Sequence, residues 1–132
     1  MEVLRPEGWP RPKGYSVGVK ARGEIVYVAG QIGWDVNREF QSDDLADQVR
    51  RALENIAMVL QTGGAEPDHI VRMTWYVTDM ETYRLQSKEI GEAYRAVMGH
   101  HYPAMTLVQV VNLVEPRAKV EIEVTAVIPD PE

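Results

Sequence analysis

The run of residues 119–127 restricts the possible folds more than any other part of the sequence. Its side chains alternate, because an extended strand would place Val120, Ile122, Val124 and Ala126 on one face and Glu121, Glu123 and Thr125 on the other. Two carboxylates in an otherwise apolar strand are costly unless their face meets water, a partner or a ligand. The run therefore predicts a strand buried on one face only, and the acidic face is where function should be sought.

Four further β-rich runs are visible. Residues 102–110 precede the acidic strand and are predicted to pair with it through a turn at residues 116–118. Residues 15–21 and 24–29 flank Arg22-Gly23, which predicts a tight hairpin. Residues 70–78 form another β-run, whereas residues 30–41 lack periodicity and are predicted to be a loop.

Two segments have the apolar spacing of helices. In the first, Ser42 or Asp43 can serve as the cap, Gly63-Gly64 ends the helix, and the apolar positions step by three or four: Leu45, Val49, Leu53, Ile56 and Leu60. The second helix is predicted between Glu81 and Gly99, with these residues facing inward: Tyr83, Ile90, Tyr94, Val97 and Met98.

The resulting order is β-β-α-β-α-β-β, which predicts an α+β fold with two helices on one face of a mostly antiparallel sheet. We expect one domain over residues 1–132, beginning with an irregular arm at residues 1–13 because that segment holds three prolines. The helix-free sheet face carries valine, tryptophan and tyrosine beside its carboxylates. That is a large apolar surface for a monomer to expose, so the pattern predicts an oligomer.

Composition excludes several classes of function. The net charge of −6 disfavours a nucleic-acid partner, and the absence of cysteine excludes disulfides and thiolate chemistry. No run is apolar enough for a membrane span, so we expect a cytoplasmic protein that does not bind membranes. Three histidines without metal-ligand spacing predict no metal site.

Five blocks, in the same order, resemble the Rid family of reactive-intermediate deaminases over nearly the whole chain. They are Gly14-Tyr15-Ser16, residues 28–33, residues 48–56, residues 71–80, and the C-terminal block of residues 102–110 and 119–127. The resemblance implies a chorismate-mutase-like fold and a homotrimer. In such trimers the bare sheet faces form a central barrel and the ligand clefts lie between subunits.

The resemblance also implies an activity, the cofactor-free hydrolysis of a small imine or enamine to a carbonyl compound and ammonia. Glu121 matches the glutamate that activates water, whereas Glu123 is interpreted as structural. Tyr15 matches a cleft tyrosine, although an ordinary strand tyrosine is an equal alternative. The remaining candidate substrate-binding residues are Gly30, Gln31, Ile32 and Gly33 of the strand-end loop, Trp34 beside them, and Ser87 as the nearest match to a polar residue of the second helix. A simple turn at residues 30–33, and a loop-anchoring role for Trp34, remain open.

Met105 is the main departure from the family pattern, because the deaminases carry a carboxylate-binding arginine there. Methionine has no charge and donates no hydrogen bond, and its thioether favours apolar ligands. We therefore expect a non-standard substrate for a hydrolase of the 2-iminobutanoate deaminase type. The alternative is a non-catalytic trimer that binds a small molecule or a protein. A third hypothesis keeps the 2-imino acid activity through another cation. Arg72 was considered for this role, but nothing in the sequence directs it to the cleft.

Overall fold

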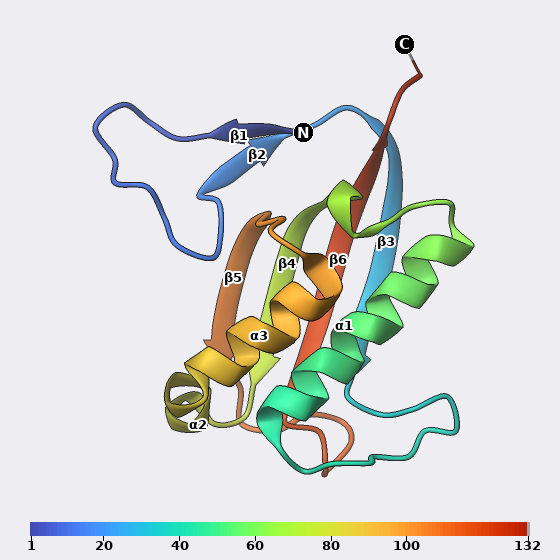
Figure 1. Ribbon diagram of the computed structural model, residues 1–132. Coiled ribbons are helices and arrows are strands. Elements are labelled where there is room, and N and C mark those ends of the chain that lie inside the picture. The colour runs from blue at the N-terminus through green and yellow to red at the C-terminus, as the bar shows by residue number, and fades with distance from the viewer. Residues whose placement is uncertain (132) are drawn as a thin grey trace.

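The computed structural model describes residues 1–131, and its main sheet has four strands in the order β3-β6-β4-β5. The elements follow one another as β1 (Glu2–Leu4), β2 (Gly18–Lys20), β3 (Gly23–Ile32), α1 (Leu45–Thr62), the 3-10 helix η1 (Pro67–His69), β4 (Ile70–Val77), α2 (Met80–Leu85), α3 (Ser87–Met98), β5 (Ala104–Gln109) and β6 (Val120–Pro129). The helices α1 and α3 lie side by side across one face of this sheet (Figure 1). The predicted α+β class is confirmed.

Helix α1 confirms the predicted apolar stripe. All five stripe residues are buried, and they join the core formed with the inward side chains of the sheet. The cap is Asp44, one residue beyond the predicted Ser42 or Asp43, and its carboxylate accepts a hydrogen bond from the backbone N–H of Asp47. Gly63 ends the helix as predicted.

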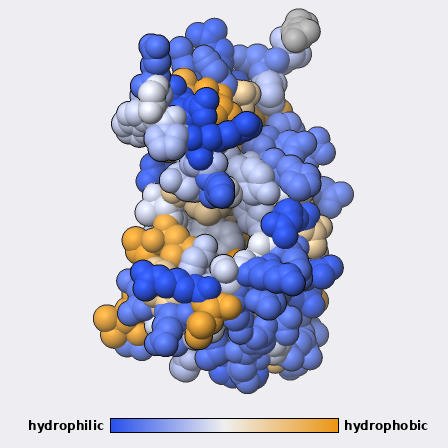
Figure 2. Space-filling model, turned by 60° about the vertical axis from the view of Figure 1, so that its left-hand side comes forward, coloured by the Kyte–Doolittle hydropathy of each residue, from blue (hydrophilic) through white to orange (hydrophobic). Residues whose placement is uncertain are grey.

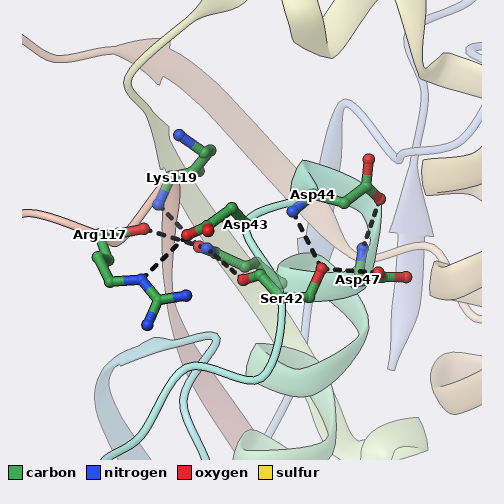
Figure 3. Close-up of polar contacts among 7 residues, drawn as sticks. Ser42, Asp43, Asp44, Asp47, Arg117 and Lys119 are labelled. Carbon is green, nitrogen blue, oxygen red and sulfur yellow. Dashed lines mark hydrogen bonds and ion pairs between the residues drawn. The ribbon is translucent and has the colours of Figure 1, made fainter.

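The start of α1 also holds the loop that leads into β6 (Figure 3). Gln48 is only 1% exposed, yet all its polar atoms are used. Its amide group donates to the carbonyl oxygens of Ser42 and Arg117, and its carbonyl oxygen accepts from the N–H of Lys119. Arg117 also forms an ion pair with Asp43 at 3.0 Å, and this hydrogen-bonded guanidinium lowers the pKa of the Asp43 carboxyl. One buried amide thus fixes the end of the loop that enters β6, at Arg117 and Lys119, to the helix.

The second helical segment is not continuous as predicted, because it divides at Gln86 into α2 and α3. Asp79 caps α2, and Gln86 turns its side chain to α1, where it binds the N–H of Ala46 and the carboxylate of Asp44. Of the predicted inward residues, Ile90, Tyr94 and Met98 are buried and the other two are half-buried. The apolar spacing was therefore right, but the segment is divided at Gln86, whose side chain binds the start of α1.

Both predicted strand pairings are wrong. The strand β2 pairs with β1, inside the segment predicted to be an irregular arm, and Arg22-Gly23 does not form a hairpin between β2 and β3. In Figure 1 this two-stranded sheet projects away from the main sheet. The strand β5 runs parallel to β4, and β6 lies between β3 and β4 instead of pairing with β5. Parallel pairing needs a crossover, which α2 and α3 provide.

The alternation in β6 is confirmed. Its apolar residues face the helices, whereas Glu121, Glu123 and Thr125 are on the uncovered face. That face also bears Ile25, Tyr27 and Val108, which are 52%, 75% and 40% exposed. Trp75 was wrongly assigned to it: the residue alternates with Met73 and Val77 and is buried beneath the helices. Among residues 1–131 no helix has the length and apolar character needed to cross a membrane.

Candidate functional site

Three predicted site residues meet in one pocket of about 450 Å³ beside β5, which we call the aromatic pocket. Tyr15, Ser87 and Met105 line it, together with other residues of the arm, β4, α2, α3 and β5: Lys13, Gly14, Trp75, Tyr83, Ile90, Gly91, Tyr94, Arg95, Tyr102 and Leu107. Figure 2, which brings this side of the molecule forward, shows a hollow whose floor has intermediate hydropathy, as tyrosine and tryptophan have.

The strand register explains why Met105 is in this pocket. It lies opposite Met73 in the parallel β4–β5 pair, so its side chain is on the helix-facing side of the sheet. Because β5 is an edge strand, Met105 stays half-buried and reaches the pocket wall. Met105 is therefore accessible from the pocket and is not fully buried in the hydrophobic core.

Ser16 attaches the arm to the same edge strand. Its backbone N–H donates to the carbonyl oxygen of Pro103 at 3.0 Å, and its hydroxyl donates to that of Tyr102 at 2.5 Å. This bridge places Tyr15, which is 42% exposed, at the mouth of the pocket. The segment that joins β1 to β2 is thus part of the wall of the site.

Several aromatic residues of the floor were not predicted as site residues. Tyr94 and Tyr102 stack with centroids 5.6 Å apart, and Trp75 lies 6.3 Å from Tyr94. The hydroxyl of Tyr94 donates to the carbonyl oxygen of His101, and burial strongly raises its pKa. A neutral, hydrogen-bonded Tyr94 gives the floor a fixed shape. The sequence signal was the inward phase of Tyr94, which was interpreted only as core packing, whereas Trp75 was assigned to the wrong sheet face.

The other predicted residues, except Gly33, gather in a second pocket of about 370 Å³, which we call the glutamate pocket. It is lined by Gly30, Gln31, Ile32, Trp34, Arg38, Val114, Glu115 and Glu121. The predicted loop at residues 30–33 is wrong in part, since β3 continues to Ile32 through a bulge between Val28 and Gln31.

Gly30 and Gly33 have different roles. A Cβ atom added to Gly30 would lie 2.5 Å from Oε1 of Glu121, so the missing side chain makes room for this carboxylate. Gly33 is outside the pocket lining, and a Cβ there would lie 2.6 Å from Cα of Gln48. Gly33 therefore serves the packing of β3's end against α1 and not the predicted ligand contact.

Trp34 both lines the glutamate pocket and anchors its loop. It packs against Phe40 with centroids 5.9 Å apart, and the Arg38 guanidinium lies 5.8 Å from its ring centroid. Asp35 closes the loop by accepting hydrogen bonds from the N–H groups of Glu39 and Asn37. These bonds, that of Glu39 first, lower the pKa of the Asp35 carboxyl.

The two acidic residues of β6 differ in their partners. Glu123 accepts a hydrogen bond of 2.7 Å from the hydroxyl of Tyr76, and this bond raises the pKa of that phenol. Within the described chain, no hydrogen bond or ion pair holds the half-buried carboxylate of Glu121. Glu121 is thus the carboxylate that remains available to a water molecule or a ligand.

Met105 and Glu121 lie on opposite faces of the sheet. Met105 is in register with Met73 on the helix side, and Glu121 is in register with Tyr76 on the uncovered side. The aromatic pocket and the glutamate pocket have no lining residue in common. A small molecule in either pocket of one chain therefore contacts only one of these two residues.

Comparison with known proteins agrees with this architecture. A family model described as Endoribonuclease L-PSP matches residues 10–128. A RutC family protein of Pyrococcus horikoshii is 34% identical over 114 residues, covering 85% of this chain and 86% of the relative. The 2-iminobutanoate/2-iminopropanoate deaminase of Salmonella typhimurium is 30% identical over 108 residues, with 80% of each chain covered.

Solved structures show the same fold. The Rid family protein YyfB of Yersinia pestis superposes with a TM-score of 0.84 at 29% identity, covering 96% of this chain and 98% of that one. TdcF of E. coli, solved with bound serine, gives a TM-score of 0.69 at 30% identity, covering 97% and 99%. The predicted Rid fold is confirmed, and the chain belongs to the Rid family, whose sequence model carries the description Endoribonuclease L-PSP.

Proposed function

We propose that this protein hydrolyses a reactive imine or enamine to a carbonyl compound and ammonia, with Glu121 as the general base. The observation that carries the proposal is the position of Glu121. Its unpaired carboxylate lies over Gly30, at the edge of an open pocket. Family membership and a relative named as an iminobutanoate deaminase support the reaction class.

The chemistry needs only a water molecule and proton transfer. The water oxygen attacks the electrophilic iminium carbon while the Glu121 carboxylate accepts a water proton, which gives a carbinolamine. The proton then moves from Glu121 to the nitrogen, the C–N bond breaks and ammonia leaves. As the C=O bond forms, the regenerated Glu121 carboxylate accepts the hydroxyl proton and later releases it to solvent. No oxidant, reductant or cofactor enters the balance.

The site is assembled between protomers in this proposal. One protomer would supply the aromatic pocket with Met105, and its neighbour the glutamate pocket with Glu121, because one chain holds them on opposite sheet faces. The uncovered face with Ile25, Tyr27 and Val108 provides the apolar surface for a homotrimer. An intersubunit cleft is therefore the arrangement that unites the predicted residues.

Met105 favours an unusual substrate. The aromatic pocket offers a thioether and aromatic rings where a small imino acid would need a cation from residue 105. The family description names an endoribonuclease, but a chain with a net charge of −6 is poorly suited to binding a phosphate backbone. A substrate with a bulkier apolar body fits the pocket better than either.

The second candidate is a non-catalytic trimer that binds a small apolar molecule. The observation that favours it is the same substitution, because loss of a carboxylate anchor costs on the order of 2–5 kcal/mol in a partly buried site. Such a protein could keep the fold and the pocket while losing turnover.

The test compares trapping of enzymatically generated 2-iminobutyrate by semicarbazide with and without the protein. We expect slow turnover by the wild type, a gain of at least tenfold in Met105→Arg, and loss of turnover in Glu121→Gln. Glu123→Gln is the matched control, because that carboxylate is already bound to Tyr76. If Glu121→Gln hydrolyses the imine as fast as the unmodified chain, the assigned base is wrong. Inactivity of both the wild type and Met105→Arg, with small and aromatic imines alike, would support the binding protein.

A further inference from the structure

The charge of the aromatic pocket differs from that of the chain. Its lining residues include two cations, Lys13 and Arg95, and no aspartate or glutamate, although the protein has 20 acidic residues and a net charge of −6. Five of the lining residues are aromatic: Tyr15, Trp75, Tyr83, Tyr94 and Tyr102. The pocket therefore combines an apolar floor with positive charge at its wall.

Arg95 reaches this pocket because Gly91 lacks a side chain. A Cβ atom at Gly91, one helical turn earlier in α3, would lie 3.1 Å from one terminal guanidinium nitrogen of Arg95 and 3.6 Å from the other. Glycine within a helix is less favourable than alanine, and here it leaves space for the guanidinium. In the described part of the chain, no carboxylate lies within ion-pair distance of Arg95.

The buried indole N–H of Trp75 is a second, independent indication that the aromatic pocket binds a ligand. Trp75 lines this pocket and is only 2% exposed. Its Nε1 is the only buried side-chain nitrogen or oxygen without a hydrogen-bond partner among residues 1–131. A buried donor without an acceptor is destabilising and rare in folded proteins, so such a group calls for an explanation. An acceptor atom on a bound ligand would satisfy it.

We propose that the aromatic pocket binds an acid with an aromatic or bulky apolar body, and that Arg95 is its carboxylate anchor in place of residue 105. The indole N–H of Trp75 donates to an oxygen of the same ligand, and the aromatic floor contacts its body. This inference rests on the proposed function for its substrate class, which becomes the 2-imino acids derived from aromatic amino acids. A pocket of about 450 Å³ is larger than the imines of alanine or serine need.

The test is a binding measurement that needs no turnover. Isothermal titration of the full-length protein with 3-phenylpropanoate, and with its uncharged amide, separates the carboxylate from the aromatic body. We expect Arg95→Gln to weaken binding of the carboxylate about tenfold and to leave binding of the amide unchanged. Arg95→Lys should recover part of the loss, and Arg84→Gln is the matched control, because Arg84 is an exposed cation on α2 outside the pocket lining.

Trp75→Phe tests the second donor while keeping an aromatic ring. We expect several-fold weaker binding of the carboxylate, with the circular dichroism spectrum of the folded protein retained. The proposal is overturned if the wild type does not bind 3-phenylpropanoate, if it binds acid and amide equally, or if Arg95→Gln and Arg84→Gln behave alike.

The two proposals can fail separately. Binding that depends on Arg95, without hydrolysis of any imine, leaves the anchor in place and removes the hydrolase. Hydrolysis that depends on Glu121 but is unaffected by Arg95→Gln, for both small and aromatic imines, keeps the hydrolase and removes the anchor.

Discussion

Replacing Gly30 by alanine should displace the Glu121 carboxylate while leaving the fold intact. The new Cβ atom would lie 2.5, 2.7 and 2.8 Å from Oε1, Cγ and Cδ of Glu121, and all three atoms belong to a flexible side chain. Rotation of Glu121 about χ1 relieves the overlap at about 0.5–1.5 kcal/mol. Alanine also lowers the conformational entropy of the unfolded chain, which stabilises the folded protein by about 0.4–1 kcal/mol. The net change in unfolding free energy should therefore be close to zero.

Gly33→Ala is the matched control, because it adds the same methyl group three residues later. Here the Cβ atom would lie 2.6 Å from Cα and 2.8 Å from the carbonyl oxygen of Gln48, which are helix backbone atoms. Backbone cannot rotate away, so β3 or α1 must shift, at a cost of about 1–3 kcal/mol. For a chain of 132 residues this corresponds to a fall in Tm of about 5–10 °C.

Thermal unfolding and the imine-trapping assay, run on both variants, separate the two effects. Gly30→Ala should keep its Tm within about 3 °C and lose at least tenfold in turnover. Gly33→Ala should instead show its main effect as a lower Tm. A crystal structure of Gly30→Ala should show Glu121 in another rotamer. The reasoning is refuted if Gly30→Ala leaves both turnover and the Glu121 rotamer unchanged, or if Gly33→Ala melts like the unmodified protein.

Three further predictions concern the fold and its assembly. Gln48→Leu removes a buried amide and leaves three partly buried backbone groups without their partner, so the unfolding free energy from urea titration should fall by about 2–4 kcal/mol. Arg117→Gln removes the main cause of the lowered pKa of Asp43, which should return toward its ordinary value in a carboxyl NMR titration, while that of Asp35 stays low. Because the folded-state pKa of Asp43 is depressed, its contribution to stability is present above the ordinary carboxyl pKa and is lost as pH falls through the folded value. Tyr27→Lys places a charge on the uncovered sheet face, where the side chain is 75% exposed, and sedimentation should show a shift from trimer to monomer; an unmodified chain that sediments as a monomer would contradict the cleft model.

Local periodicity explains which parts of the fold could be predicted. The stripe from Leu45 to Leu60 and the alternation around Glu121 depend on neighbours in sequence, and the structure confirms both. Strand pairing depends on residues far apart in sequence. The β1–β2 pair and the parallel β4–β5 pair were therefore missed, and two hairpins between sequence neighbours were predicted in their place. The break at Gln86 was missed for the same reason, because its partner Asp44 is 42 residues away.

The candidate site likewise has residues that the sequence could predict and residues that only the structure reveals. Family resemblance pointed to Met105 and Glu121, which are now found in two separate pockets. It did not point to Arg95, whose position depends on a glycine one helical turn away, or to the unsatisfied N–H of Trp75. Glycine is a weak helix former, but the sequence alone does not show that Gly91 leaves space for the Arg95 guanidinium.

The separation of Met105 and Glu121 by the thickness of one sheet has an evolutionary consequence. Mutations around Met105 alter ligand specificity on the helix side of the sheet. Glu121, the proposed base, lies on the uncovered side and is not affected by them. If both proposals hold, a lineage can exchange an arginine for a methionine, and use a helix cation instead, without altering the surface that carries Glu121. Each cleft of the assembly would then consist of two independently varying modules that meet only when the chains associate.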